Sequence, residues 1–390
     1  MMPTAPTPHQ RLHGLDTLRA LAILLVFTNH YMNFVTDRAT FGFVSEIGWT
    51  GVDLFFALSG YLIGNQIFAA LRADAFSLPR FYARRLLRTL PNYYVVLALY
   101  AFWPLFAGGT HHAPWWKYLT FTLNFDLMPG TRFSHAWSLC VEEQFYMVLP
   151  AAVLAIACWQ GAVRLGWCVI AACFGAGMLL RAHGWDVAHQ PHGGTSAFYR
   201  EIYYATLCRF DELVAGVALA LLKNHHAALW TRLTAWGNRT LVLGLLVVAL
   251  AWRIFLVDHF GRTETIYGYP LLALGFGLLV LAALSPGSLL HRLRVPGAGA
   301  IALWSYAIYL THKQLCVILA ARLAPFGLDA DKPAGIAVLL VASILAGWLM
   351  YALVETPFMR LRERFVPLAP MKKPAGGAAG LQVQAGPGPG

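Results

Sequence analysis

Charged side chains are scarce in this chain. Asp, Glu, Lys and Arg make up 12% of its 390 residues, whereas 58% of the residues are hydrophobic. Soluble globular proteins carry roughly 25% charged residues, so this sequence lacks about half of the ionic groups that a water-facing surface needs. The composition excludes a sizeable soluble domain and indicates an integral membrane protein, in agreement with a mean hydropathy of +0.57.

Several motifs of common chemistry are also missing. The six cysteines all fall in apolar stretches, without the C-x-x-C pairs or the Cys/His spacing of a zinc site. The sequence has no H-E-x-x-H, no G-x-S-x-G and no phosphate-binding P-loop. His183, His189 and His192 recur at multiples of three residues, but Gly184 and Pro191 argue against a regular helix there. We therefore expect no bound metal.

Ten apolar runs recur along the chain, each of about the length that spans a bilayer. They cover residues 15–35, 49–68, 90–105, 136–159, 165–180, 203–222, 241–257, 267–284, 301–321 and 334–354. The sequence thus predicts an all-α integral membrane protein, a bundle of about ten transmembrane helices within a domain at 11–367. The apolar stretch 118–127 is too short to span and is expected as a loop or re-entrant piece. Residues 368–390, rich in Gly, Pro and Ala, are expected to form a disordered cytoplasmic tail.

The net charge of +11 reflects membrane topology better than binding to nucleic acid. With a cytoplasmic N-terminus, the cytoplasmic segments contain most of the basic residues: Arg11, Arg72, Arg80, Arg84, Arg85, Arg88, Arg164, Lys223, Arg232, Arg239, Arg292, Arg294, Arg360, Arg362, Arg364, Lys372 and Lys373. The opposite loops and span ends contain fewer: Arg38, Lys117, Arg132, Arg181, Arg200, Arg253, Arg262, Arg322 and Lys332. This bias predicts a multi-pass protein of the cytoplasmic (inner) membrane with both termini in the cytoplasm.

Two ionisable residues in the first apolar run are candidate functional residues, because such groups are costly inside a bilayer. Arg19 and His30 lie on one face of that helix, about 16 Å apart along its axis. Arg19 would lie near the cytoplasmic surface and His30 in the outer half of the membrane. Alternatively, Asp16 pairs with Arg19, and His30 is a satisfied polar residue of the bundle.

Arg85 and Arg88 follow the second run, one helical turn apart. A pair of guanidinium groups at a membrane surface suits phosphate, although arginines that flank a span are also the ordinary topology signal. Further along the chain, Arg209, Asp211 and Glu212 are expected to form buried ion pairs that hold helices in register.

Five stretches carry a resemblance to a known family: HGLDTLRALAILLVFTNH, GVDLFFALSGYLIG, FYARRLLRTLP, HAWSLCVEEQFY and SYAIYLTH. In this order they resemble the membrane acyltransferase-3 family, which includes O-acyltransferases of bacterial surface glycans. The resemblance implies a ten-helix enzyme that moves an acyl group, commonly acetyl from acetyl-CoA, to a hydroxyl of an exported carbohydrate. It implies family roles for Arg19 and His30, for the R-x-x-R pair Arg85 and Arg88, and for Glu142.

The expected activity is that of a membrane-bound, acyl-CoA-dependent O-acyltransferase. Neutral His30 would act as the general base for the acceptor hydroxyl, and an acyl-histidine intermediate is the variant left open. Arg19, Arg85 and Arg88 would bind the phosphates of acetyl-CoA or another acyl-CoA, and Glu142 would orient a cation or the acceptor. The expected partners are the acyl-CoA, a carbohydrate or lipid-linked glycan acceptor and the lipid bilayer.

Two rival functions remain at this level. A polytopic transporter or flippase of a glycan or lipid precursor would also contain many spans with charges near the midplane. It would need paired broken helices in matching halves, which the sequence does not display. An amine acetylase would share the donor and differ only in its acceptor.

Overall fold

The computed structural model describes residues 12–191 and 193–367, and these residues form helices joined by connections without a strand. The tail expected at 368–390 lies outside the described residues. Each apolar run of the sequence overlaps one α-helix, the run 203–222 only with its second part: α1 (His13–Tyr31), α3 (Thr50–Arg72), α4 (Leu78–Phe102), α7 (Trp137–Ala157), α8 (Ala162–Ala188), α10 (Asp211–His225), α12 (Asn238–Val257), α13 (Tyr269–Leu284), α15 (Ala298–Leu323) and α16 (Pro333–Met350). Shorter helices lie between and after them: α2 (Phe43–Ile47), α5 (Pro104–Ala107), α6 (Trp115–Leu119), α9 (Thr195–Phe198), α11 (Ala227–Thr234), α14 (Leu289–Arg292) and α17 (Thr356–Phe365).

The all-helical prediction is confirmed for the described residues. Seven helical stretches among them have the length and the apolar composition needed to cross a membrane. The runs on α4, α10 and α15 are helical but fall outside this group, so a count of about ten spans stays a prediction. α10 has 15 residues, and α4 and α15 carry charged residues along their lengths.

Helix boundaries follow local sequence signals. α16 begins at Pro333, and α4 has Pro79 in its first turn, where the missing N–H would have no helical partner in any case. Gly161 precedes α8 and Gly297 precedes α15, with φ angles of +78° and +80°. Residues other than glycine rarely adopt this backbone conformation. The polypeptide can therefore turn sharply just before each of these helices.

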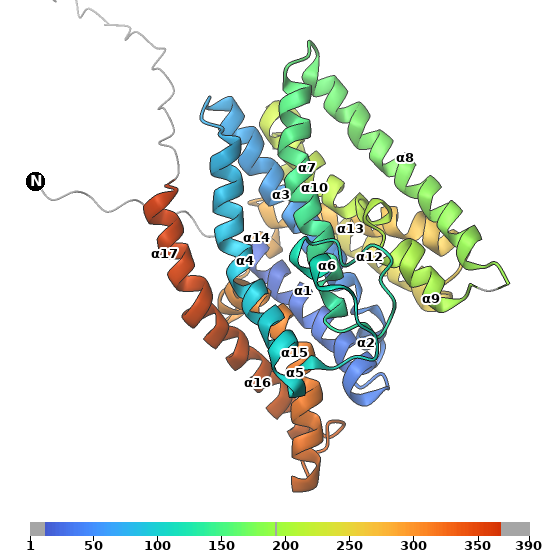
Figure 1. Cartoon of the computed structure of the whole chain (residues 1–390). Coiled ribbons are helices and arrows are strands. Elements are labelled where there is room, and N and C mark those ends of the chain that lie inside the picture. Colours follow the sequence, from blue (N-terminus) through green and yellow to red (C-terminus); the bar gives the residue numbers. More distant parts are fainter. Residues whose placement is uncertain (1–11, 192, 368–390) are drawn as a thin grey trace, which may run out of the picture.

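The helices are arranged around α1, which packs against α3, α13 and α15. Figure 1 shows α4, α16 and α17 along one side of the bundle and α8 along the opposite side. α3 and α10 make the closest helix pair, because glycines on both helices remove side chains from their contact. A Cβ at Gly60 would lie 1.9 Å from the carbonyl oxygen of Leu213, and one at Gly216 would lie 2.3 Å from that of Ala57.

Buried ion pairs join helices near this contact, as the sequence predicts for Arg209 and Asp211. Arg209 pairs with Asp53 of α3, not with an acid of its own segment. Asp211 pairs with Arg181 of α8, with 2.8 Å between Nη2 and Oδ2, and both side chains are fully buried. Arg181, counted from the sequence with the opposite loops and span ends, thus lies within α8 with a buried side chain. A buried charge needs a partner, and a residue on another helix supplies it.

α8 is longer than the sequence predicts. It continues through Gly184 to Ala188, where an irregular segment was expected. Glycine inside a helix costs only about 1 kcal/mol, and packing outweighs this cost because a Cβ at Gly184 would lie 3.0 Å from Cγ1 of Ile202. The nearby His189 stacks on Trp185, with 3.7 Å between ring centroids. Within residues 12–191 and 193–367, no three His, Cys, Asp or Glu side chains form a group that could bind a metal ion.

The stretch 118–127 folds into the bundle as the end of α6 and the turns that follow it. Tyr118, Leu123 and Leu127 are buried in the hydrophobic core. The hydroxyl of Tyr118 donates a hydrogen bond of 2.8 Å to the carbonyl oxygen of Arg132. This segment leads directly into the start of α7, which borders both cavities described next.

Candidate active site

A cavity of about 510 Å³ lies at the C-terminal end of α1, and we call it the histidine cavity. His30, His135 and His259 line it, together with Asn29 and Asn33. Two π-helical segments, Met32–Thr36 and Tyr199–Tyr203, contribute to its wall. π-Helical segments are rare in proteins overall, and those that do occur are often found at functional sites. Of the predicted site residues, His30 is the one that lines this cavity.

His30 is joined to His312 of α15. The Nδ1 atom of His30 lies 2.9 Å from the Nε2 atom of His312, and the Nδ1 atom of His312 lies 2.8 Å from the carbonyl oxygen of Ile308. A carbonyl oxygen only accepts hydrogen bonds, so His312 carries its proton on Nδ1, and its Nε2 accepts the proton of His30 Nδ1. In its neutral form, His30 therefore has its lone pair on Nε2. A general base needs such a free lone pair to accept a proton.

A third histidine, His135, lies beside this pair, with 5.8 Å between its ring centroid and that of His30. Its Nε2 atom lies 3.3 Å from the carbonyl oxygen of Leu310, and its buried Nδ1 atom has no hydrogen-bond partner among the described residues. His135 is 3% exposed. Lys313 of α15 also lies nearby, and its Nζ donates a hydrogen bond of 3.1 Å to Ser134 Oγ.

His259 lies in the connection after α12 and also lines the histidine cavity. Its ring packs edge-on against Trp49, with 5.1 Å between centroids. Burial, together with the positive charge of Arg209, lowers the pKa of His259 to about 4. His259 is therefore neutral at pH 7 and adds no charge to the cavity.

A second cavity, of about 720 Å³, contains the other four predicted site residues, and we call it the arginine cavity. Arg19 comes from α1, Arg85 and Arg88 from α4, and Glu142 from α7. The structure thus brings together residues that are far apart in the sequence. Because Arg19 and His30 lie about 16 Å apart along α1, the two cavities follow one another along this helix.

Hydrogen bonds within the bundle fix the position of Glu142. Its carboxylate accepts hydrogen bonds from Ser59 of α3 and Tyr146 of α7. The guanidinium of Arg85 lies 3.6 Å from the ring centroid of Tyr146. The buried Nε atom of Arg85 has no partner within the part of the chain that the structure describes. The cavity therefore offers a guanidinium with a free donor beside an oriented carboxylate.

A thin layer of side chains separates the two cavities. Trp137 lines the histidine cavity, whereas its neighbour Ser138 lines the arginine cavity with Tyr309. The hydroxyl of Tyr309 donates to the carbonyl oxygen of His135 at 2.7 Å and lies 2.6 Å from Ser138 Oγ. We call Trp137, Ser138 and Tyr309, with His135, the partition. Tyr309 and His312 lie three residues apart on one face of α15, but the sequence does not show that this face meets α7.

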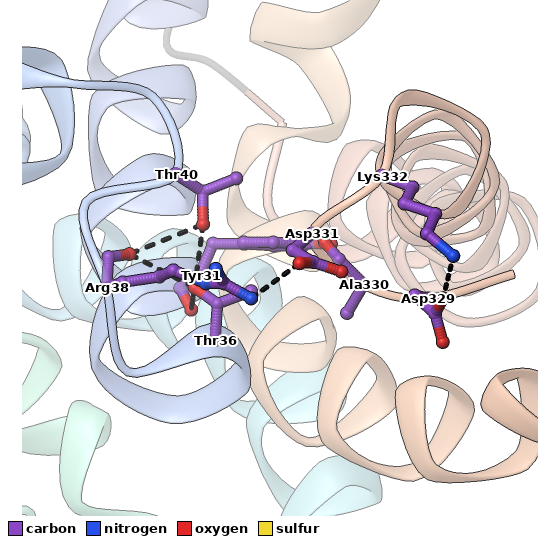
Figure 2. Close-up of polar contacts among 8 residues, drawn as sticks. All are labelled: Tyr31, Thr36, Arg38, Thr40, Asp329, Ala330, Asp331 and Lys332. Atoms are coloured by element: carbon purple, nitrogen blue, oxygen red, sulfur yellow. Dashed lines mark hydrogen bonds and ion pairs between the residues drawn. The ribbon is translucent and has the colours of Figure 1, made fainter.

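A set of polar contacts ties the end of α1 to the connection between α15 and α16 (Figure 2). The hydroxyl of Tyr31 donates to the carbonyl oxygen of Ala330 at 2.6 Å, and Arg38 Nη2 lies 2.5 Å from Asp331 Oδ2. Tyr31 directly follows His30, and α15 carries His312. These contacts thus hold the C-terminal end of α1, where His30 lies, against the connection that follows α15.

Comparisons with known proteins identify relatives. YrhL of Bacillus subtilis, whose name proposes a peptidoglycan O-acetyltransferase, is 29% identical over 80% of this chain and 49% of its own length. The peptidoglycan O-acetyltransferase OatA of Listeria monocytogenes is 30% identical over 54% of this chain and 33% of its own. The O-acetyltransferase OatA of Staphylococcus aureus is 23% identical over 93% and 59%. The chain thus spans about half the length of these relatives.

No solved structure matches the chain. The sequence profile of a family described as an acyltransferase domain matches residues 12–352. This match includes both cavities, the partition and all five predicted site residues. The chain therefore belongs to this acyltransferase family.

Proposed function

We propose that the protein is a membrane O-acyltransferase that moves an acyl group, in the simplest case acetyl, from acyl-CoA to a hydroxyl of a cell-surface carbohydrate. Membership of the acyltransferase family supports the reaction class. The names of the relatives, two of which specify peptidoglycan, support the acceptor class. The observation that carries the proposal is the pair of cavities, one with a cluster of arginines and one with an available histidine nitrogen, arranged along α1.

The arginine cavity fits the anionic part of the donor. Arg19, Arg85 and Arg88 supply guanidinium groups, which bind phosphate oxygens through pairs of hydrogen bonds. Glu142 lies within electrostatic range of Arg19 and Arg85 but is not positioned to act on the acceptor, because it does not line the histidine cavity. In this proposal the narrow thioester arm of the donor passes the partition toward His30.

The histidine cavity fits the acceptor hydroxyl. As the hydroxyl oxygen attacks the carbonyl carbon of the thioester, its proton moves to Nε2 of His30, and the C–S bond breaks. The departing thiolate then takes up a proton, so that one ester and one free thiol replace one hydroxyl and one thioester. His312 accepts the hydrogen bond of His30 Nδ1–H throughout and stabilises the imidazolium that forms.

The two-step variant uses the same atoms in a different order. Nε2 of His30 would attack the thioester first and form an acyl-histidine, which the acceptor hydroxyl would then cleave. Rapid acid quenching of enzyme and acetyl-CoA without acceptor, followed by mass spectrometry of peptides, distinguishes the routes. An acetylated peptide containing His30 supports the two-step route, and its absence from a preparation that turns over once the acceptor is added supports the direct route.

Thiol release tests the proposed function directly. The protein, purified into lipid nanodiscs, should release free CoA from acetyl-CoA when a peptidoglycan fragment or another surface carbohydrate is added, and the carbohydrate should gain an acetyl ester. The His30→Ala variant is the matched control. Protein that binds the carbohydrate and carries it across a vesicle membrane without releasing thiol would instead establish the rival transporter, for which the comparisons give no support.

A further inference from the structure

A small basic cavity of about 300 Å³ lies beside the arginine cavity. Four arginines line it: Arg84, Arg85 and Arg88 of α4 and Arg362 of α17. Arg85 and Arg88 line both cavities, so the two spaces are adjacent. α17 packs along α4, as Figure 1 shows, and this packing brings Arg362 to the site. We call this space the arginine pocket.

Two glutamates that do not line the arginine pocket interact with these arginines. Glu363 binds two of them, with 2.8 Å from its Oε1 to Arg84 Nη2 and 2.6 Å to Arg362 Nη2. Glu355, which accepts a hydrogen bond of 2.9 Å from Asn92, lies within electrostatic range of Arg88 and Arg362. The charged groups that line the arginine pocket itself are all cationic. Such a lining attracts a compact anion.

The proposed donor carries two separate anionic groups, a diphosphate and a phosphate monoester on its ribose. We infer that the arginine pocket binds a phosphate monoester of the donor, the 3′-phosphate of acyl-CoA, while the larger arginine cavity takes the diphosphate. This inference rests on the proposed function and makes the protein selective for a 3′-phosphorylated donor. A phosphate dianion presents the same oxygen pattern to paired guanidinium groups as a carboxylate, with more charge.

Glu363 has a defined part in this arrangement. Without donor, its carboxylate neutralises Arg84 and Arg362, and these two arginines are the ones that the larger cavity does not share. Binding of the phosphate monoester requires them to exchange Glu363 for the ligand. Glu363 therefore weakens donor binding by competition, and its neutral amide counterpart should strengthen it.

The test compares acetyl-CoA with acetyl-3′-dephospho-CoA as donors for the full-length protein in nanodiscs. For Arg362→Ala, the KM for acetyl-CoA should rise at least about tenfold, the equivalent of one charge-assisted hydrogen bond, whereas the KM for the dephospho donor should not change. For Glu363→Gln, the KM for acetyl-CoA alone should fall. Arg360→Ala, which alters an exposed arginine of the same helix outside the pocket, should leave both KM values unchanged.

Two outcomes would overturn the inference. An equal rise in both KM values for Arg362→Ala, with no change for Glu363→Gln, would assign these residues a purely structural role. Wild-type activity that depends on the anionic phospholipid content of the nanodiscs with either donor, together with loss of this dependence in Arg362→Ala, would show that the pocket binds a lipid headgroup instead. If the wild-type protein releases no thiol from either donor, the proposed function itself is wrong, which separates the two conclusions.

Discussion

The imidazole rings of His30 and His312 lie nearly parallel, at 6° to one another, with 5.0 Å between their centroids. One ring comes from α1 and the other from α15, and a hydrogen bond of 2.9 Å joins them. The carbonyl oxygen of Ile308 fixes the proton of His312, and His312 in turn fixes the proton of His30. A backbone group thus determines which nitrogen of His30 is basic.

We expect His30→Ala to abolish acyl transfer while the protein still folds and inserts into the membrane. Loss of a general base typically costs about 10²–10⁴-fold in rate. The measurement is thiol release at saturating donor, with thermal unfolding in detergent as the check on folding. His189→Ala, which removes a histidine stacked on Trp185 outside both cavities, is the control. Near-normal turnover of His30→Ala would remove His30 from the mechanism.

Replacement of His312 should have a smaller effect of a different kind. His312→Ala leaves the Nδ1–H of His30 without its acceptor, at a cost of about 1–3 kcal/mol, so kcat should fall about 5–150-fold. The KM for the donor should stay the same, because His312 does not line the arginine cavity. His312→Gln offers a carbonyl oxygen in place of Nε2 and should restore part of kcat. A rise in KM with unchanged kcat would contradict the role of His312 as a positioning residue.

Arg85→Ala and Arg88→Ala should weaken donor binding, since each lost charge-assisted contact is worth about 1.5–3 kcal/mol. The loss should be larger for acetyl-CoA than for a short acyl thioester without the nucleotide. Steady-state kinetics with both donors measures this difference. Equal losses with the two donors would mean that the arginines support the fold and not the ligand.

The donor should act from the cytoplasmic side. The distribution of lysines and arginines predicts that Arg19, Arg85 and Arg88 lie at that surface, with His30 further out. In oriented vesicles, acetyl-CoA supplied on the face that displays a C-terminal tag should support acylation. Activity with acetyl-CoA confined to the other face would refute both this orientation and the assignment of the arginines.

The contact between α3 and α10 should be sensitive to a single methyl group. Gly60→Ala places a Cβ 1.9 Å from a carbonyl oxygen of α10, and overpacking of this kind typically costs about 1–3 kcal/mol. Gly175→Ala is the matched control, because no atom lies within 4 Å of its added Cβ on the exposed face of α8. Thermal unfolding in detergent should show a lower midpoint for Gly60→Ala alone. Equal midpoints would show that the helices separate at little cost.

Helical periodicity and hydropathy were enough to predict which segments form helices, because these signals are local. They also predicted that Arg85 and Arg88 share a helix face, and the structure places both in one cavity. Pairings between distant helices leave no local signal. For this reason the contact of His30 with His312 and the pairing of Arg181 with Asp211 came only from the structure.

The extent of α8 shows a different limit. The sequence alone does not show whether a glycine lies within a helix or in a loop. The difference here comes from a neighbouring residue that packs closely against the glycine, where a side chain would not fit. At Gly184 that neighbour is Ile202, which belongs to a segment that returns to α8 only after a turn of the chain. Local rules therefore ended the helix too early.

The partition has an electrical consequence under the proposed orientation. Where polar cavities enter a bilayer from both faces, the transmembrane voltage falls across the thin layer between them, here Trp137, Ser138 and Tyr309 with His135. Moving one elementary charge through 100 mV involves about 2.3 kcal/mol. In the proposed reaction the phosphates would remain on one side of this layer, and the acyl group that crosses it would be neutral. The membrane voltage would then neither drive nor oppose the passage of the acyl group, and modification of the outer surface would not draw on an ion gradient.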